Sequence, residues 1–489
     1  MTDAEFLAWA ASPDAMRCVL VEAWANVGGA ETVRYLSSRD YVTGAAATPA
    51  STAYRAVLSG AVTINERLSI DGSASLSAGD VEIDNAGELD TWLDDVWTNR
   101  AVKVFVGDPR WPRAAFRQIF DGTIARLGSR SRNKLNLVMR DKLQRLNTPM
   151  TSTKLGGSTD NKDRLLPLCF GECHNIEPLL INPATLQYQV HAGPIERIIE
   201  VRVNGVPVTH TPNLANGTFT LATSPTGTVT ASVQGEKTGG VYRNTIGELI
   251  PHIVTNYGKA VDRFAAGDVD SAQITTFSSG HPQPVGLYLS DRTNVLDTCA
   301  SLASSVGAQV IMSRAGQLRL LKMALPATGT PTAVGPEQMG LHSLQPSDRP
   351  AIRAAVKLGY ARNWTPQPGL QTGIPPAHQE LFGTEWLTVS ATAPAVATLH
   401  RLELEATQED SLLLVEADAQ AEADRRKALW SVQRTVYAYD GTPDLMLEQL
   451  GGYQTLTASR YGLAGGVSGQ IVGLSQDWAR CRVNVEVLV

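Results

Sequence analysis

The heptapeptide DGTIARL at Asp121–Leu127 has a counterpart near the other end of the chain, SGQIVGL at Ser468–Leu474. Each follows a strand-like stretch and precedes a segment in which apolar and polar residues alternate. The alternating apolar residues are Leu135, Leu137 and Met139 after the first heptapeptide, and Val483, Val485 and Val487 after the second. Both stretches therefore predict β-hairpins. Two interpretations stay open: two ordinary hairpins, or two related barrels, one at each end of the chain.

The sequence before the first heptapeptide is also rich in strands and turns. Residues 17–24 (RCVLVEAW) and 32–36 flank the turn sequence NVGG at 26–29, which predicts a hairpin. Residues 101–106 (AVKVFV) predict a further strand. One helix is expected at 89–97, because apolar residues recur there at i, i+3, i+4, i+7 and i+8. These residues are Leu89, Trp92, Leu93, Val96 and Trp97.

The middle of the chain alternates more cleanly. Ile199, Val201 and Val203 are expected to face one side of a strand that ends at the turn pair Asn204-Gly205. Residues 154–163 are rich in Gly, Ser, Asn and Asp, and they predict a loop.

Three helices are expected further along. The first covers 245–257, where Thr245 and Glu248 have capping-box spacing. The second follows Asp291 and ends at Gly307. The third covers 411–429, with acidic residues early and basic residues late, as the helix dipole favours.

Together these patterns predict a mainly β, multidomain protein with α+β elements. The expected parts are an N-terminal tube-type β-barrel domain with one helix (1–150), a β-rich insertion (151–235), an α/β domain (236–345) and a C-terminal β-barrel domain with one long helix (346–489). A chain of 489 residues is long enough for several cores.

Composition excludes some classes of protein. The net charge is −6, so a strongly basic nucleic-acid-binding surface is not expected. The five cysteines are an odd and scattered set, which favours assembly in a reducing cytoplasm over a disulfide scaffold. The first residues lack a signal-peptide pattern, and no apolar run approaches the roughly 18 residues of a membrane span.

Sequence motifs for catalysis are absent. No G-x-S-x-G, Walker A, G-x-G-x-x-G or H-E-x-x-H pattern occurs, and the eight histidines are scattered. Cys169, Cys173 and His174 form the best metal candidate, and Cys299 and Cys481 would have to complete an iron–sulfur cluster. Against this, Cys299 lies on an apolar helix face and Cys481 is expected in a strand. We therefore predict no catalytic, cofactor-binding or metal-binding residues.

Other candidate groups favour structural roles. Asp94-Asp95 and the pair Glu196 and Glu200 could be glycosidase carboxylates, but solvated surface acids are more common. Trp92 and Trp97 could bind sugar or membrane, but at this spacing they favour a core or a subunit interface. A basic cluster could touch DNA, but a solvated barrel face or salt bridges to a neighbouring ring is the favoured interpretation. The cluster comprises Arg126, Arg130, Arg132, Lys134, Arg140, Lys142 and Arg145.

The chain resembles tail-tip hub proteins of long, non-contractile tailed phages. The resemblance is carried by EIDNAGELDTWLDDVWTNRAVKVFVGDPRW with GTIARL and VMRDKLQRLNTPM, by PLCFGECHNIEPLLI with LQYQVHAGPIERIIEVRVNG, and by TNVLDTCASLASSVGAQVIMSRAGQLRLL with VSGQIVGLSQDWARCRVNVEVL. It implies a homotrimer in which each chain supplies two tube-type barrels, so that six barrels dock on a hexameric distal-tail ring.

The resemblance also implies a function and partners. A structural, non-enzymatic hub at the virion tail tip, assembled in the host cytoplasm, closes the tube, joins the central tail fibre, holds the end of the tape measure protein and opens for DNA. DNA passes without specific binding. The alternatives are a distal tail protein ring and a tail-tip peptidoglycan hydrolase.

Overall fold

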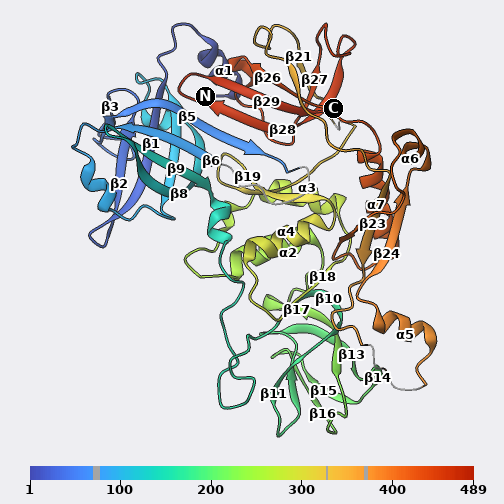
Figure 1. Cartoon of the computed structure of the whole chain (residues 1–489). Coiled ribbons are helices and arrows are strands. Elements are labelled where there is room, and N and C mark those ends of the chain that lie inside the picture. The colour runs from blue at the N-terminus through green and yellow to red at the C-terminus, as the bar shows by residue number, and fades with distance from the viewer. Residues whose placement is uncertain (70–77, 327–328, 368–369, 371–372) are drawn as a thin grey trace. The chain divides into compact units, whose positions relative to one another are not determined.

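A computed structural model describes residues 1–69, 78–326, 329–367, 370 and 373–489 (Figure 1). Strands hold 40% of the chain and helices 19%, which confirms the mainly β, multi-sheet class. The chain forms two compact units. Unit 1 contains residues 1–145, 309–351 and 433–489, and unit 2 contains residues 146–308 and 352–432. The division into four domains stays a prediction.

Unit 1 is built almost entirely of strands. Its elements are α1 (Asp3–Ala11), β1 (Cys18–Val27), β2 (Ala30–Ser37), β3 (Tyr41–Val42), β4 (Ala53–Ala56), β5 (Leu58–Arg67), β6 (Ala78–Asp84), η1 (Asp90–Asp94), β7 (Ala101–Gly107), η2 (Arg113–Ala115), β8 (Arg117–Ser131), β9 (Lys134–Asp141), η3 (Lys142–Leu146), β19 (Ala308–Met312), β20 (Leu318–Lys322), β21 (Thr332–Val334), β22 (Gln345–Asp348), β26 (Val436–Gly441), η6 (Pro443–Leu445), β27 (Tyr453–Leu456), β28 (Val467–Asp477) and β29 (Arg482–Leu488).

One 15-stranded sheet organises unit 1. Its strand order is β22-β26-β29-β28-β5-β6-β9-β8-β7-β1-β2-β4-β3, and β21 and β27 pair off this path. The sheet joins both ends of the sequence, because β28 pairs with β5. No pairing among the described residues closes this path into a barrel, so the two expected barrels are replaced by one open sheet. Apolar residues of both hairpins share a single core, for example Ile124, Met139 and Val487.

Unit 2 combines three sheets with helices. Its elements are β10 (Leu168–Ile176), β11 (Leu179–Asn182), β12 (Gln187–Gln189), β13 (Ile195–Val203), β14 (Val206–Pro207), β15 (His210–Asn213), β16 (Thr218–Leu221), β17 (Val229–Glu236), η4 (Thr238–Gly240), α2 (Ile246–Asn256), η5 (Ala266–Asp268), α3 (Ser271–Gly280), β18 (Gly286–Leu289), α4 (Val295–Ser304), β23 (Ala355–Tyr360), α5 (Pro376–Gly383), β24 (Leu387–Thr392), α6 (Pro394–His400), β25 (Gln408–Asp410) and α7 (Glu416–Trp430). The sheet orders are β14-β13-β17-β10-β18, β11-β12-β16-β15 and β24-β23-β25. No helix among the described residues is long and apolar enough to span a membrane.

Several local predictions are confirmed. The hairpin across residues 26–29 is β1–β2, and Asn204-Gly205 connects β13 to β14 with positive φ at both residues. Helix α2 begins after Thr245 with the expected capping box to Glu248. The two later helices are α4, followed by Gly307 at φ 67°, and α7.

Two periodicity predictions were wrong. The expected helix at 89–97 is a single 3₁₀ turn, η1, and Val96 pairs with Asn26 of β1. Leu93 is therefore 47% exposed and Val96 52% exposed, although both belonged to the expected apolar face. In β13 a bulge between residues 198 and 200 turns Ile199 outward (37% exposed), while Val201 stays buried.

Candidate assembly interface

The two heptapeptides lie in two copies of one four-stranded arrangement. In the first copy the strand order is β6-β9-β8-β7, and in the second it is β26-β29-β28-β27. The chain visits each set in the same sequence, β6 to β9 and β26 to β29. Topology alone therefore favours a duplication over two unrelated hairpins.

The register of the two hairpins matches through the heptapeptides and as far as Ser129, beyond which only β8 has a second bulge. A bulge interrupts the β8–β9 ladder between Ile124 and Arg126, and the β28–β29 ladder between Ile471 and Gly473. The extra residue is the fifth of the heptapeptide in both cases. Bulges fix register and strand direction, so a bulge at the same position is a specific structural repeat.

A third match lies where the outer strand of each copy begins. Asn99 (φ 61°) and Gly451 (φ 81°) both adopt the left-handed conformation at this point. Each copy then makes the same two backbone hydrogen bonds. In the first copy Asn99 N donates to Ile124 O (2.8 Å) and Ile124 N donates to Arg100 O (2.8 Å). In the second, Gly451 N donates to Ile471 O (2.9 Å) and Ile471 N donates to Gly452 O (2.8 Å). The likeness therefore extends across three strands of each copy.

The strand beyond β6 has a counterpart as well. Asp84 N donates to Val57 O (2.7 Å) in the first copy, and Thr442 N donates to Gln338 O (3.0 Å) in the second. The pairing continues through β5–β6 and β22–β26, where Ile64 opposes Gly79 and Pro346 opposes Tyr437. Strand β22 is therefore the shorter equivalent of the second half of β5.

The two copies meet where β28 pairs with β5. The register runs from Gly473 opposite Arg67 to Asp477 opposite Thr63. Two backbone hydrogen bonds flank it: Leu68 N donates to Val472 O (2.8 Å), and Trp478 N donates to Val62 O (3.0 Å). We call this pairing the in-chain junction (Figure 1).

Side chains close the in-chain junction against water. Trp478 and Gln476 are fully buried, and Glu66 is 7% exposed. Arg314, in the turn between β19 and β20, lies 3.3 Å from Glu66 Oε2 and donates to the carbonyl oxygens of Met446 (3.1 Å) and Glu448. A buried acid is tolerated only when such a partner compensates it, so this arginine is part of the junction.

Each copy leaves the same kind of edge unpaired elsewhere. In β8, residues 126–131 correspond to the half of β28 that pairs with β5, yet no strand among the described residues pairs with that edge. In β22, the edge away from β26 is likewise unpaired, since the described sheet path ends there. All four residues of β22 are exposed, as are Arg126, Ser129 and Arg130 of β8.

The expected metal candidates do not converge. Cys169 and Cys173 both lie in β10 and are buried, and burial raises the pKa of the Cys173 thiol well above its usual value. His174 lies beside Glu172 (Nε2 to Oε1 3.2 Å). Cys481 was expected in a strand, but it occupies the turn between β28 and β29 at φ 50°. The described part of the chain contains no group of three His, Cys, Asp or Glu suited to hold a metal ion.

The carboxylates and tryptophans occupy structural positions. Asp95 is paired with Arg34 (2.9 Å), Glu196 with Lys237 (2.6 Å) and Glu200 with Arg202. Trp92 and Trp97 are 5% and 4% exposed, with ring centroids 5.8 Å apart, and they belong to the core of unit 1.

The basic cluster lies mainly on β8, β9 and their connection. Lys134 is paired with Glu82 of β6, and Lys142 lies 3.0 Å from Asp121 of β8. Arg130 is 3.7 Å from Asp80 and 58% exposed. These contacts place much of the cluster in salt bridges on the sheet, at and beside the unpaired half of β8.

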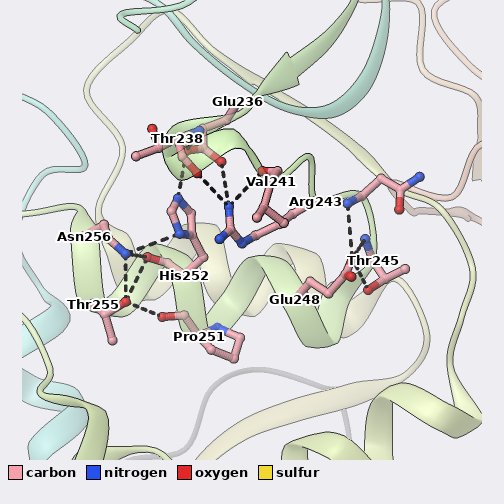
Figure 2. A network of polar contacts seen from close by, with 11 residues as sticks. Glu236, Thr238, Val241, Arg243, Thr245, Glu248, Pro251, His252, Thr255 and Asn256 are labelled. Carbon is pink, nitrogen blue, oxygen red and sulfur yellow. Dashed lines mark hydrogen bonds and ion pairs between the residues drawn. The ribbon is translucent and has the colours of Figure 1, made fainter. Parts of the chain in front are cut away.

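Unit 2 contains a buried ionic network (Figure 2). Glu236, at the end of β17, is fully buried and lies 3.0 Å from His252 Nε2 of α2. Thr238 N also donates to it (2.8 Å), and Arg243 lies 3.6 Å away. Burial raises the pKa of Glu236, but the hydrogen bonds from His252 and Thr238 outweigh burial and lower the pKa overall. The network fastens a strand to a helix.

Sequence reasoning missed Arg314, Trp478 and strand β5. The alternating buried residues Val62, Ile64, Glu66 and Leu68 would have indicated the strand. Nothing local indicates its partner, since β28 lies about four hundred residues later in the sequence.

No known family profile matches the chain, and no curated protein matches it in sequence. Solved structures similar to it include the 43 kDa tail protein of prophage MuSo2 from Shewanella oneidensis (10% identity, 97% of this chain and 98% of that chain, TM-score 0.43). Prophage tail protein gp18 from Listeria monocytogenes is similar at 7% identity (96% and 94%, TM-score 0.42). A chain of a native gene transfer agent virion is similar at 14% identity (71% and 91%, TM-score 0.42). At TM-scores below 0.5, these likenesses do not establish a common fold.

Proposed function

We propose that this chain is a structural hub of a phage tail tip, in which three copies close one ring. The observation that carries the proposal is the duplicated four-stranded arrangement, with the same strand order and the same heptapeptide bulge in both copies. The tail proteins reported above have TM-scores too low to support it. The proposal rests on the chain's own duplication and on the sequence resemblance to hub proteins.

The duplication would allow a trimer to match the sixfold symmetry of a tail tube. A tail tube built of hexameric rings has to join a threefold structure at its tip. Three chains with two equivalent sheets each provide six equivalent surfaces toward the tube and three toward the tip. Closed rings of this kind also cover sheet edges, which otherwise aggregate.

The partners follow from this role. The six sheets dock on the distal tail protein ring, and the same chain holds the end of the tape measure protein and the central tail fibre. The net charge of −6 suits a channel through which DNA passes without adhering. Such work depends on interfaces and a shift between closed and open arrangements, and it requires no catalytic residue.

The mass of the purified chain in solution, measured by light scattering and read beside negative-stain images, tests the proposal. We expect a trimer whose rings show threefold or pseudo-sixfold shape. A hexamer would instead support the distal tail protein. A monomer at all concentrations would contradict a self-closing hub ring.

A further inference from the structure

We propose that residues 126–131 of β8 pair with β22 of a second copy of this chain, and that this contact repeats the in-chain junction between subunits. The inference rests on the proposed homotrimer, and it names the strands and register that would form the ring. Its basis is that the structure contains one completed example of the contact and both halves of another.

The duplication determines the register of the contact. Gly473 and Ser475 of β28 correspond to Arg126 and Gly128 of β8, because both hairpins share the heptapeptide bulge. A second bulge at Arg130 has no counterpart in β28, so Asp477 corresponds to Ser131. Gln345 of β22 corresponds to Thr63 of β5 through their pairing with Ala438 and Asp80.

In the in-chain junction Asp477 opposes Thr63, so Ser131 should oppose Gln345 of the second copy. In the same way Ser475 opposes Asn65, so Gly128 should oppose Asp348. Both pairs belong to the class without mutual backbone hydrogen bonds, because the bonded pairs include Val472 with Leu68 and Trp478 with Val62.

Charge is complementary at this register. Gly128 has open space where a side chain would be, so the carboxylate of Asp348 would meet no steric obstacle there. Arg126 lies two residues away on the same face, within reach of a diagonal cross-strand contact. Arg126 and Asp348 are both exposed in the single chain.

Pro346 makes the contact weaker than its in-chain model. Its counterpart Ile64 opposes Gln476, in the series of pairs that exchange backbone hydrogen bonds. Proline has no N–H to donate, so the contact between chains loses one such bond. Proline on an exposed edge also limits indiscriminate strand pairing, which suits an edge reserved for one partner.

The polarity of the contact leads to a ring. Each chain presents one half of β8 and one β22, which are two different surfaces. Contacts between unlike surfaces are head to tail, and they close into rings when the rotation between copies permits. Copies of the two sheets would then alternate around the ring, joined by one in-chain and one between-chain junction per subunit.

Disulfide trapping in the full-length chain tests the register. The variant Gly128→Cys with Asp348→Cys should form disulfides between chains under mild oxidation, because directly opposed side chains of this pair class are close. A matched control, Asn65→Cys with Ser475→Cys, should form a disulfide within one chain at the equivalent position of the in-chain junction. A slipped pair, Ser129→Cys with Asp348→Cys, places the thiols on opposite faces and should not cross-link. The five native thiols are buried, so background is low.

Non-reducing gels and light scattering together separate the outcomes. Three-chain species from the Gly128 and Asp348 pair, in a yield like that of the in-chain control, support the inference. A trimer in solution in which this pair cross-links no better than the slipped pair overturns it and leaves the proposed hub standing. Cross-linked chains that extend well beyond three support the strand contact and overturn the closed ring. A monomer without cross-links overturns both.

Discussion

The in-chain junction and the unpaired half of β8 are built on the same pattern, yet they differ in what surrounds them. In the junction, Gly473, Leu474 and Gln476 of β28 are buried, with Trp478 beside them. In β8, the corresponding stretch is half-buried or exposed, and the exposed Arg132 stands where the junction has tryptophan. The same strand geometry therefore forms a contact within the chain at β28 and leaves an edge at β8 for the contact proposed between chains. Burial of apolar and polar side chains distinguishes the two, not hydrogen-bonding capacity.

The largest effect should come from removing the junction's tryptophan. Trp478→Ala is expected to lower the free energy of unfolding of unit 1 by about 3–5 kcal/mol, because a fully buried indole leaves a cavity. Urea denaturation, combined with hydrogen exchange of the β28 and β5 amides, measures it. Arg132→Ala, at the exposed equivalent position just after β8, should change stability by less than about 0.5 kcal/mol. Equal losses in the two variants would contradict the view that burial distinguishes the junction from the unpaired half of β8.

Acid should lower the free energy of unfolding of unit 2 more than that of unit 1. Burial lowers the pKa of His191 from 6.5 to about 4, and its Nδ1 accepts a hydrogen bond from Cys169 N (3.0 Å). A histidine with a lowered pKa contributes stability that is complete above pH 6.5 and is lost as pH falls toward 4. The loss is about 3 kcal/mol. Glu236, whose pKa is lowered, adds a further loss below pH 4.5.

Thermal unfolding of unit 2 between pH 7 and 4 measures this loss, with hydrogen exchange resolving the two units. His191→Asn retains an acceptor for Cys169 N and cannot be protonated, so its unfolding should vary less across this window. An unchanged pH dependence in this variant would assign the acid sensitivity to another group.

Replacing Pro346 of β22 by a residue with a backbone N–H should strengthen the proposed contact between chains. Pro346→Ile introduces the residue found at the equivalent position of β5, with its N–H. One added hydrogen bond is worth about 1 kcal/mol, which corresponds to roughly fivefold tighter association per contact. Light scattering over a dilution series gives the trimer dissociation midpoint. Pro350→Ala, outside the strand, should leave that midpoint where it is.

The smallest effect is electrostatic. Asp348→Asn should weaken trimer association by about 0.5 kcal/mol per contact at low salt, because an exposed carboxylate beside Arg126 is lost. The difference should vanish near 0.5 M salt, where screening is strong. Asp160→Asn, an exposed acid in a loop of unit 2, is the matched control. A persistent difference at high salt would argue against charge pairing at this register.

The sequence predicted short-range features well. Asn204-Gly205, the Thr245–Glu248 box and both hairpins are local, because each is determined by residues within a few positions of one another. The duplication was visible in the sequence as two similar heptapeptides. Their shared bulge was not, because no particular residue type marks a bulge. A bulge also defeated the alternation at Ile199, and a bridge from Val96 to β1 replaced the expected helix.

The interface itself was beyond local reasoning. The in-chain junction pairs Thr63 with Asp477, and no pattern within either strand names the other. Arg314 is equally cryptic, since a charged residue in a β-turn predicts solvent exposure and not a buried partner such as Glu66. Only the fold shows that the edge of β28 is paired with β5, while no described strand pairs with the equivalent edge of β8.

The path of the chain gives the exposed strand β22 a mechanical position. The polypeptide passes between the two units four times, after Arg145, Ala308, Ala351 and Val432. The third passage leaves unit 1 a few residues after β22, and the fourth returns just before its partner β26. Tension applied to unit 2 would therefore reach β22, a short strand that the described pairing holds along one edge only, through the third of these four connections. In a ring joined through β22, part of any pull on unit 2 would act directly on the contact between subunits.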